Sequence, residues 1–212
     1  KKRFSIESQD FHNKLLKLRA KNPNIFGEIY DQFKLNAQLR SIFYNNKFLR
    51  IFSKILNTKV EKIYLNGFML RLDAPNDKKN ILDWHQDTPH YLMTNSKMNS
   101  GVCWVSITKN SRKNGTLVYI PGSHREFIQK FYKTKKNKNS SESLKITLSK
   151  KELVKAKNLN QSFGDVSFLH LNLKHRSGIN KSSKFRITFG CRFHSMEDGF
   201  NTGKEVYRLN RF

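Results

Sequence analysis

The chain has 212 residues, with 41 Lys and Arg against 16 Asp and Glu, which gives a formal net charge of +25. Hydrophobic residues make up 37% of the sequence and include 17 Phe that need a core, so the composition excludes a disordered basic tail. No apolar run approaches the ~20 residues that span a bilayer. The length predicts a single domain over residues 1–212.

The positive charge first suggests nucleic acid as a partner. Lys greatly outnumbers Arg, however, whereas recognition of bases and phosphates favours the Arg fork, so we expect a small-molecule substrate instead. The two cysteines, Cys103 and Cys191, are too few for a disulfide scaffold, which is typical of a cytoplasmic protein. No signal peptide is visible, although the sequence begins at Lys1 and not at Met. The sequence leaves the oligomeric state open.

Residues 1–60 are predicted to be helical, because apolar residues recur there every three or four positions. Ser8 or Asp10 can cap the first helix, residues 22–24 (Asn-Pro-Asn) interrupt the pattern, and the last helix ends near Asn57. We expect these helices to pack on the outside of a core.

From residue 61 the pattern changes to short strands separated by Gly, Pro and Asn turns. The predicted strands are 61–72, 101–108, 117–120, 165–170 and 185–193. This arrangement indicates a jelly roll or barrel rather than βαβ units. The predicted fold class is therefore mainly β with flanking helices (α+β), with residues 61–194 forming the core.

Two segments are expected to lie outside that core. A basic insertion near residues 133–157 begins with a polar stretch, 133–141, that has no apolar period and is predicted to be an exposed loop. The C-terminal segment, residues 195–212, is either a lid over the mouth of a cavity or an ordinary tail.

The segment Trp84-His85-Gln86-Asp87 carries the first chemical signal. Side chains two residues apart on an extended chain point to the same face, so His85 and Asp87 lie side by side. An imidazole and a carboxylate are two of the three ligands of the 2-His-1-carboxylate facial triad that holds non-haem Fe(II). The pattern alone is weak, because His124-Arg125-Glu126 matches it as well.

A third ligand has two candidates, His170 and His175. On a straight strand they lie on opposite faces, and parity does not say which face looks inward. The residues favour His175 only slightly, because Ser177 and Gly178 after it let the backbone turn close to a ligand.

The predicted strand 185–193 alternates well. Its odd-numbered positions are apolar, whereas its even-numbered positions include Arg186, Thr188 and Arg192. Arg and Thr inside a barrel are costly unless an anion lies there, and Arg can bind the distal carboxylate of a dicarboxylate through two parallel hydrogen bonds. The alternative is a strand whose polar face is solvated.

Four stretches together give a resemblance to a known family. They are Trp84–Asp87, Asn114–His124 (NGTLVYIPGSH), Gly164-Asp165, and His175–Asn180 (HRSGIN) followed by Arg186. In this order they resemble the phytanoyl-CoA dioxygenase (PhyH-like) family of Fe(II)/2-oxoglutarate oxygenases. The spacing of eleven residues between His175 and Arg186 also matches that family.

The resemblance implies a double-stranded β-helix (cupin-like jelly roll) and a complete site. It implies that His85, Asp87 and His175 are the catalytic Fe(II) ligands, and that Arg186 and Ser177 hold the far carboxylate of 2-oxoglutarate. Trp104 matches, with an offset of one residue, a family Trp beside that cosubstrate. His124 then takes a structural position, and His170 becomes a core residue or a neighbour of the ligands.

The implied activity is that of an Fe(II)/2-oxoglutarate-dependent dioxygenase, which consumes O₂ and releases succinate and CO₂. Related halogenases carry a small residue where Asp87 stands, so the presence of Asp87 predicts hydroxylation. Candidate substrate contacts near the proposed iron are Tyr64, Arg71, His90 and Arg192. The arginines among them favour an anionic substrate.

Alternative readings remain at this point. One is a cupin-like metal-binding protein without 2-oxoglutarate turnover, against which Arg186 and Ser177 argue, since such a protein needs no anchor for the cosubstrate. The others are an oxygenase acting on a carrier-bound acyl group, a protein or a nucleic acid, with the basic 133–157 region docking an acidic partner.

Overall fold

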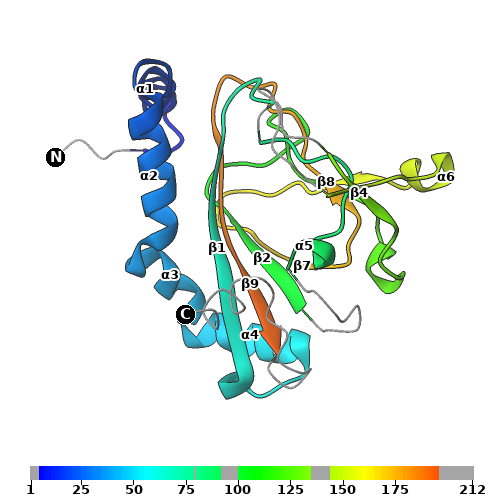
Figure 1. Cartoon of the computed structure of the whole chain (residues 1–212). Helices are drawn as coiled ribbons and strands as arrows, with labels where there is room; N and C mark the ends of the chain where they lie inside the picture. The colour runs from blue at the N-terminus through cyan, green and yellow to red at the C-terminus, as the bar shows by residue number, and fades with distance from the viewer. Residues whose placement is uncertain (1–4, 79, 92–99, 135–143, 196–212) are drawn as a thin grey trace, which may run out of the picture.

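The computed structural model describes residues 5–78, 80–91, 100–134 and 144–195, without the side chains of residues 90 and 91. A layer of helices covers one face of an antiparallel sheet, and a smaller sheet lies across the other face (Figure 1). This arrangement confirms the predicted jelly roll with flanking helices.

Four helices form the outer layer. They are α1 (Gln9–Lys21), α2 (Pro23–Leu35), α3 (Ala37–Tyr44) and α4 (Asn46–Leu56). The Ser8 hydroxyl accepts from the backbone N–H of Phe11, and Asn57 ends α4 in the left-handed region at φ 49°, as predicted. Two further breaks were not predicted, at Asn36 and Asn45, whose side-chain oxygens cap the next helix.

All five predicted strands are present, in two antiparallel sheets. The larger sheet has the order β1 (Ile63–Asp73), β9 (Arg186–Ser195), β2 (Ser100–Ser106) and β7 (Val166–His170). The smaller sheet has the order β6 (Lys157–Asn158), β3 (Val118–Tyr119) and β8 (His175–Arg176). Short helical turns complete the fold: η1 (Val60–Lys62), α5 (Thr88–Tyr91) and η2 (Ser123–Arg125).

The basic insertion contains more regular structure than the sequence predicts. A two-stranded sheet of β4 (Phe131–Lys133) and β5 (Leu144–Ile146) is followed by the short helix α6 (Lys150–Leu153). Ile146 is buried, and Ser149 and Glu152 form a reciprocal capping box at the start of α6. The polar stretch 135–141 and the C-terminal residues 196–212 lie outside the described residues.

The hydrophobic core lies between the helical layer and the larger sheet. Its members include Phe43 and Phe52 from the helices and the apolar side chains of β9 and its flank: Phe185, Ile187, Phe189, Cys191 and Phe193. Phe52 stacks on Phe193 with ring centroids 4.5 Å apart. Burial of a Phe side chain contributes about 1.5–3 kcal/mol, so this stripe fixes which face of β9 meets the helices and leaves the other face to line a cavity.

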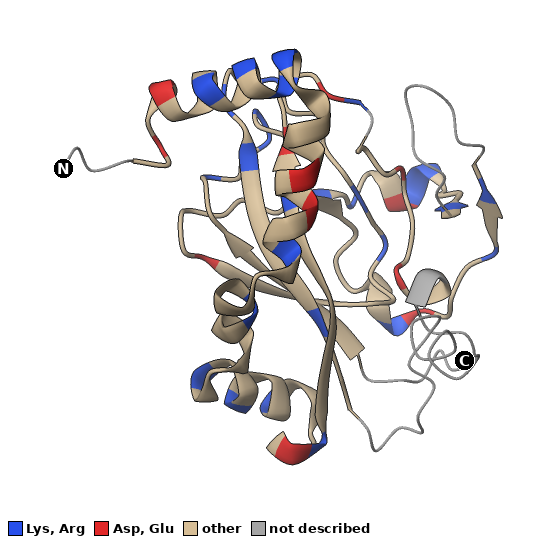
Figure 2. Ribbon diagram, turned by 60° about the vertical axis from the view of Figure 1, so that its left-hand side comes forward, with Lys and Arg blue, Asp and Glu red and all other residues tan. Residues whose placement is uncertain are grey.

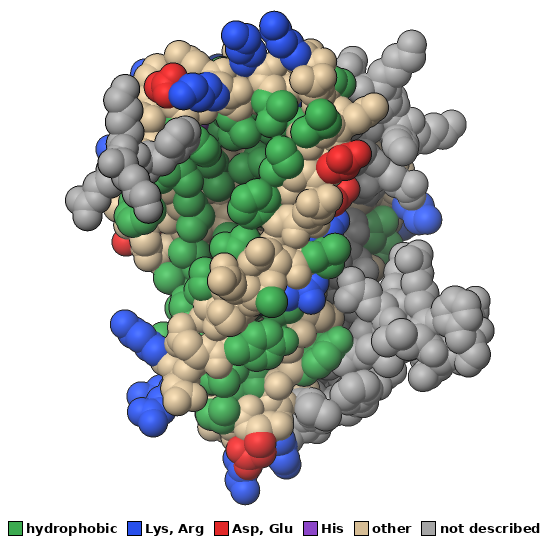
Figure 3. Space-filling view, turned by 90° about the vertical axis from the view of Figure 1, so that its left-hand side faces the viewer, with side chains coloured by type: hydrophobic (Ala, Val, Ile, Leu, Met, Phe, Trp, Pro, Cys, Tyr) green, Lys and Arg blue, Asp and Glu red, His purple; other side chains and the backbone are tan. Residues whose placement is uncertain are grey.

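The surface carries the charge and part of the apolar content. Lys and Arg are spread over the helices and the loops (Figure 2). Hydrophobic side chains also run along the outer side of the helical layer, where Phe33 and Leu35 are partly exposed (Figure 3). Among the described helices, none has both the length and the hydropathy that a membrane crossing needs.

Candidate metal centre

His85 and His175 are brought together by their own backbones. The two residues form an antiparallel bridge in which His85 N–H donates to the His175 carbonyl (2.9 Å) and His175 N–H donates to the His85 carbonyl (3.0 Å). A directly paired couple of this kind places both side chains on one face, and Asp87, two residues on, shares that face.

The three side chains form a compact cluster. The imidazole centroids of His85 and His175 are 4.2 Å apart, and Oδ1 of Asp87 lies 3.6 Å from Nε2 of His85 and 4.0 Å from Nε2 of His175. One ligand atom from each residue falls within 4.8 Å of the others, as a single metal ion requires. Both histidines are buried.

The hydrogen bonds of the two imidazoles leave Nε2 available to a metal. Nδ1 of His85 donates to the Asp83 carbonyl at 2.7 Å, and Nδ1 of His175 donates to the Leu173 carbonyl at 2.8 Å. A carbonyl can only accept, so each Nδ1 carries the proton and each Nε2 presents a lone pair toward Asp87. The sequence therefore builds the tautomer that metal ligation needs.

The protonation states also suit a cation. Burial, with the charge of His85 adding to it, lowers the pKa of His175 to about 4, so its ring is neutral near pH 7. Burial opposes ionisation of Asp87, but the imidazoles of His85 and His175 and the cation of Arg192 outweigh it and hold its pKa well below the usual range. Two imidazoles and one carboxylate form a donor set that fits Fe(II).

The cluster opens onto a cavity of about 100 Å³ between the two sheets. The cluster lies in its wall together with five other predicted residues: Arg71 on β1, Arg186 and Arg192 on β9, Trp104 on β2 and Ser177 after β8. The polar face of β9 therefore looks into the cavity, and the alternative of a solvated polar face is wrong.

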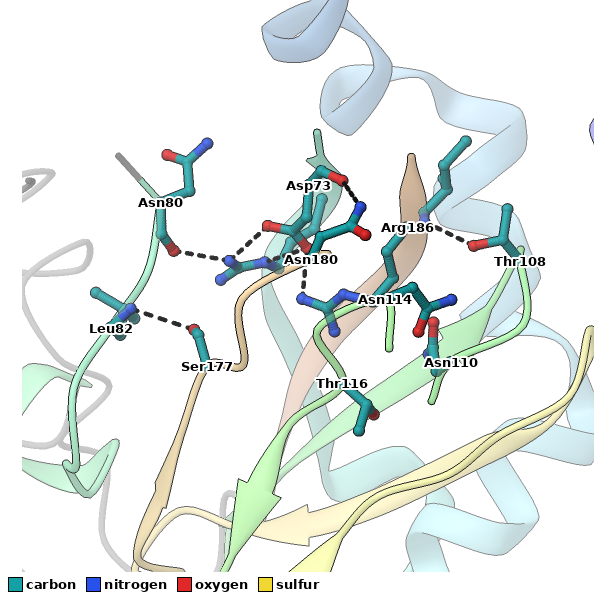
Figure 4. A network of polar contacts seen from close by, with 12 residues as sticks. Asp73, Asn80, Leu82, Thr108, Asn110, Asn114, Thr116, Ser177, Asn180 and Arg186 are labelled. Carbon is teal, nitrogen blue, oxygen red and sulfur yellow. Dashed lines mark hydrogen bonds and ion pairs between the residues drawn. The ribbon is translucent and has the colours of Figure 1, made fainter. Parts of the chain in front are cut away.

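Arg186 lies in a network of charges at one end of this cavity (Figure 4). It is the register partner of Asp73 on β1, and its Nη2 donates to Oδ2 of that carboxylate at 2.5 Å. Its Nε is buried and has no hydrogen-bond partner among the described residues. A buried donor without a partner is costly, so this atom fits the carboxylate of a ligand such as 2-oxoglutarate.

Arg71 shares the same carboxylate. Its Nη2 lies 2.8 Å from Oδ1 of Asp73, and it also donates to the Asn80 carbonyl at 2.9 Å. Burial opposes the charges of this network, but mutual attraction raises the pKa of Arg71 and lowers that of Asp73. The three groups Arg71, Asp73 and Arg186 thus carry a net charge of +1, which one ligand carboxylate balances.

The remaining predicted residues lie at different distances from this centre. Arg192 lines the cavity and contacts the sulfur of Met69 at 3.5 Å. Tyr64 is on β1 with its ring 5.9 Å from that of His194, and it is not among the cavity-lining residues. His90 belongs to α5, and its side chain lies outside the described part of the structure.

The two other candidate histidines lie apart from the cluster. His170 on β7 and His124 on η2 have ring centroids 5.7 Å apart and line a separate groove. Nδ1 of His170 accepts from the Asn172 N–H at 3.0 Å, which leaves its Nε2 protonated in the neutral ring. His175, and not His170, therefore completes the cluster with His85 and Asp87.

Sequence reasoning missed two polar residues of the cavity region. Asp73 lies one residue beyond the predicted strand 61–72, whereas β1 includes it; an acidic residue two positions after Arg71 on a strand shares its face, and that spacing is a signal that could have found it. Asn110 lines the cavity with its Oδ1 buried and unpartnered among the described residues, and no local pattern points to it.

Solved structures with similar folds were found by comparison. EvdO2 from Micromonospora carbonacea var. aurantiaca, complexed with 2-oxoglutarate, aligns with a TM-score of 0.61 and 17% identity over 74% of this chain and 63% of EvdO2. The non-heme monooxygenase ThoJ aligns with a TM-score of 0.63 and 19% identity over 90% of this chain and 69% of ThoJ. The epimerase SnoN, in complex with Fe³⁺, alpha ketoglutarate and nogalamycin RO, aligns with a TM-score of 0.59 and 14% identity. The alignment covers 78% of this chain and 61% of SnoN.

These likenesses show the fold, and the chain spans less than two thirds of EvdO2 and of SnoN. No curated protein matches the chain in sequence. The family model described as Phytanoyl-CoA dioxygenase (PhyH) matches residues 4–188, which is most of the sequence. On that match, together with a His-Asp-His cluster that fits Fe(II), the chain belongs to the phytanoyl-CoA dioxygenase (PhyH) family of Fe(II)/2-oxoglutarate oxygenases.

Proposed function

We propose that this protein hydroxylates a small molecule that carries an anionic group, converting 2-oxoglutarate and O₂ into succinate and CO₂. One observation carries the proposal: the cluster of His85, Asp87 and His175 opens onto the same cavity as Arg186, whose buried Nε lacks a partner among the described residues. A metal site and an anchor for an anion in one cavity suit a metal-bound dicarboxylate cosubstrate.

In this proposal Nε2 of His85, Nε2 of His175 and the Asp87 carboxylate hold Fe(II). When bound, the iron would supply a centre for chemistry in which O₂ is the oxidant: one oxygen atom would go to succinate as 2-oxoglutarate loses CO₂, and the other to a C–H bond of the substrate. The protein's own groups fix the ligand geometry, present Nε2 of each imidazole, and hold the reacting atoms in a small cavity. The Asp87 carboxylate occupies a metal position that halide would need, which supports hydroxylation over halogenation.

Arg186 is the proposed anchor of the far carboxylate. Its Nη2 is already held by Asp73, so Nε and the rest of the guanidinium are left to meet the ligand. Ser177 adds a hydroxyl whose oxygen accepts from the Leu82 N–H at 3.2 Å, so its proton is available to a ligand oxygen. Trp104, which lines the same cavity, supplies a flat apolar wall for the cosubstrate.

The substrate is proposed to lie toward Arg192. This arginine is six residues from Arg186 along β9 and on the same face, and it lines the same cavity as Asp87. A cation in that position favours an anionic group on the substrate. Arg71 already donates to Asp73, so Arg192 is the stronger candidate of the two for binding the anionic group of the substrate. Tyr64 and His90 are further proposed substrate contacts.

The test is succinate formation from 2-oxoglutarate with Fe(II), measured over a panel of acyl-CoAs, amino acids, phosphonates, sugars and compatible solutes. We expect at least one anionic compound to stimulate turnover, and Asp87→Ala to abolish it. Asp31→Ala, at an exposed position of α2, serves as the control. Arg192→Gln should raise the KM for the anionic substrate more than for a neutral analogue. A wild type that binds no iron and stays as inactive as Asp87→Ala on every compound would refute the proposal.

The state of the two cysteines supports a proposal for the cellular location of the protein. Cys103 and Cys191 are free, buried and directly opposite each other on β2 and β9, and burial raises the pKa of both thiols. Thiols of this kind suit a reducing compartment, which supports the cytoplasm as the proposed location.

A further inference from the structure

Lys174 is a fully buried lysine. It has no exposed surface, and it directly precedes His175 of the metal cluster. Neighbouring residues of an extended segment point to opposite sides, so its side chain extends away from the cavity that His175 faces. A buried ammonium group destabilises the fold unless a group of opposite charge pairs with it.

Two carboxylates surround the ammonium. Nζ of Lys174 forms an ion pair with Glu126, just after η2, and another with Glu152 of α6 at 2.7 Å. Burial alone would lower the pKa of Lys174, but hydrogen bonds to Glu126 and Glu152 outweigh it and raise that pKa. The hydrogen bond from Lys174 in turn lowers the pKa of Glu152 to about 2, so Lys174 and Glu152 are both charged near neutral pH.

The backbone of Lys174 is held as firmly as its side chain. Its N–H donates to the Ser123 hydroxyl at 3.0 Å, and its carbonyl accepts from the Ile120 N–H at 3.0 Å. The segment before His175 is therefore fixed to η2 and to the end of β3, while the side chain ties it to the basic insertion.

The segment just before the basic insertion reaches the other metal-binding segment. The Gln129 N–H donates to Oε1 of Gln86 at 2.9 Å, and Gln86 lies between His85 and Asp87. In the amide orientation that satisfies both neighbours, the Gln129 oxygen accepts from Nζ of Lys174 at 2.6 Å. A continuous chain of hydrogen bonds thus links Lys174 to Gln86 behind the metal cluster.

We propose that Lys174 is a positioning residue for the metal centre, which holds His175 and, through Gln129 and Gln86, the segment of His85 and Asp87 in the geometry that binds Fe(II). The inference rests on the proposed metal site. It gives a role at the centre to the basic insertion, through Glu152, and to the segment before it, through Glu126 and Gln129. Groups that orient metal ligands from behind typically change metal affinity 10–100-fold when they are lost.

The experiment compares Lys174→Met with Lys145→Met, measured against the wild type. Lys145 belongs to the basic insertion and pairs with Asp83, two residues before His85, but the side chains of both Lys145 and Asp83 are partly exposed. Each protein is titrated with Co(II) as the probe, at a temperature at which circular dichroism shows all three folded. The readouts are the dissociation constant and the visible absorption spectrum at saturation, which reports the coordination geometry of Co(II).

We expect Lys174→Met to bind Co(II) at least tenfold more weakly and with an altered spectrum, and Lys145→Met to stay within twofold of the wild type. A purely structural role would lower the melting temperature of Lys174→Met and leave the affinity and spectrum of the folded protein unchanged; that result would overturn the inference. Equal losses in both variants would overturn it as well.

A milder variant keeps the test decisive if Lys174→Met does not fold. Glu152→Gln retains an amide oxygen for the Ser149 N–H while it removes one charge from the ammonium's surroundings. We expect it to weaken Co(II) binding about threefold, and unchanged binding would count against the inference. A wild type that binds no Co(II) would instead refute the metal site itself, which separates the two failures.

Discussion

Asp73 controls how Arg186 can meet a ligand. The carboxylate takes one donor of Arg186 and two of Arg71, so the guanidinium of Arg186 is fixed in orientation before any ligand arrives. A group held in this way loses less conformational freedom on binding. The cluster's net charge of +1 also matches a single carboxylate better than it matches a dianionic phosphate.

The first prediction concerns this guanidinium. In Arg186→Lys all the donors lie on one nitrogen, so the side chain lacks the planar fork that can reach Asp73 and a bound carboxylate at once, and the KM for 2-oxoglutarate should rise at least tenfold. The rate at saturating 2-oxoglutarate should fall much less. Steady-state succinate formation measures both, with Arg125→Lys at an exposed position as the control. An unchanged KM would remove Arg186 from the proposed anchor.

A second prediction follows from His194, which lies buried between Ser100 and Asn66. Burial, helped by the charge of Arg192, lowers its pKa to about 4, against about 6.5 in an unfolded chain. Between these values the unfolded chain binds a proton that the folded protein does not. The free energy of unfolding therefore falls as the pH drops from 7 toward 4.

Urea denaturation of the metal-free protein at pH 7 and pH 5 tests this expectation. His194 should account for about 2 kcal/mol of the loss between the two pH values, and His194→Gln, which keeps hydrogen-bonding groups at the site, should lack that part of the loss. Parallel pH profiles for the wild type and the variant would show that His194 is already protonated, or solvated, in the folded protein.

Elements were predictable where a local pattern sets them. The apolar period of 185–193 gave β9 and its two faces, because alternation is imposed by the backbone of the strand itself. The breaks at Asn36 and Asn45 were missed, since Asn is so common in this chain that a single capping Asn is a weak signal. β4 and β5 were missed because Lys residues interrupt their short apolar runs.

In the candidate site too, local spacing predicted some features, and tertiary contacts set the others. The spacing of His85 and Asp87 is local, and it placed both on one face. The pairing with His175 depends on two backbone hydrogen bonds between residues 90 positions apart, in a strand of two residues, and no local pattern predicts that. There the family resemblance decided between His170 and His175. The ion pair between Arg186 and Asp73 and the burial of Lys174 are likewise set by tertiary contacts.

The third prediction concerns the turn after β8. Gly178 was expected to let the chain approach a ligand, whereas its backbone lies against another segment of the protein: a Cβ there would stand 2.5 Å from the Thr116 carbonyl. Gly178→Ala should therefore destabilise the protein by about 1–3 kcal/mol and displace the neighbouring Ser177. The same change at Gly27 in α2, where a Cβ meets nothing within 4 Å, should stabilise by about 0.5–1 kcal/mol.

Urea denaturation of both variants gives the two free energies. For Gly178→Ala we also expect a higher KM for 2-oxoglutarate, because the shift reaches the hydroxyl of Ser177. Equal stabilities of the two variants would mean that the 115–116 and 178–180 segments can separate without cost.

On the scale of the whole molecule, the apolar and ionic contents are separated in space. The Phe-rich core joins the helical layer to the larger sheet, while the functional cations are few and lie inside the cavity. Most of the remaining Lys and Arg are spread over the surface without gathering on one element (Figure 2). A net charge of +25 then acts mainly as self-repulsion, which disfavours the compact state.

The last prediction tests that consequence. Raising NaCl from about 0.1 M to about 1 M shortens the Debye length from about 10 Å to about 3 Å, which screens repulsion between surface charges. The melting temperature should therefore rise, by several degrees, when it is followed by circular dichroism. A variant with four exposed lysines replaced by Gln, at positions 109, 113, 155 and 157, has less repulsion to screen. It should start from a higher melting temperature in low salt and gain less from added salt. A flat or falling response in the wild type would mean that the surface ion pairs, such as Lys14 with Asp10, outweigh the repulsion, because salt weakens those pairs instead.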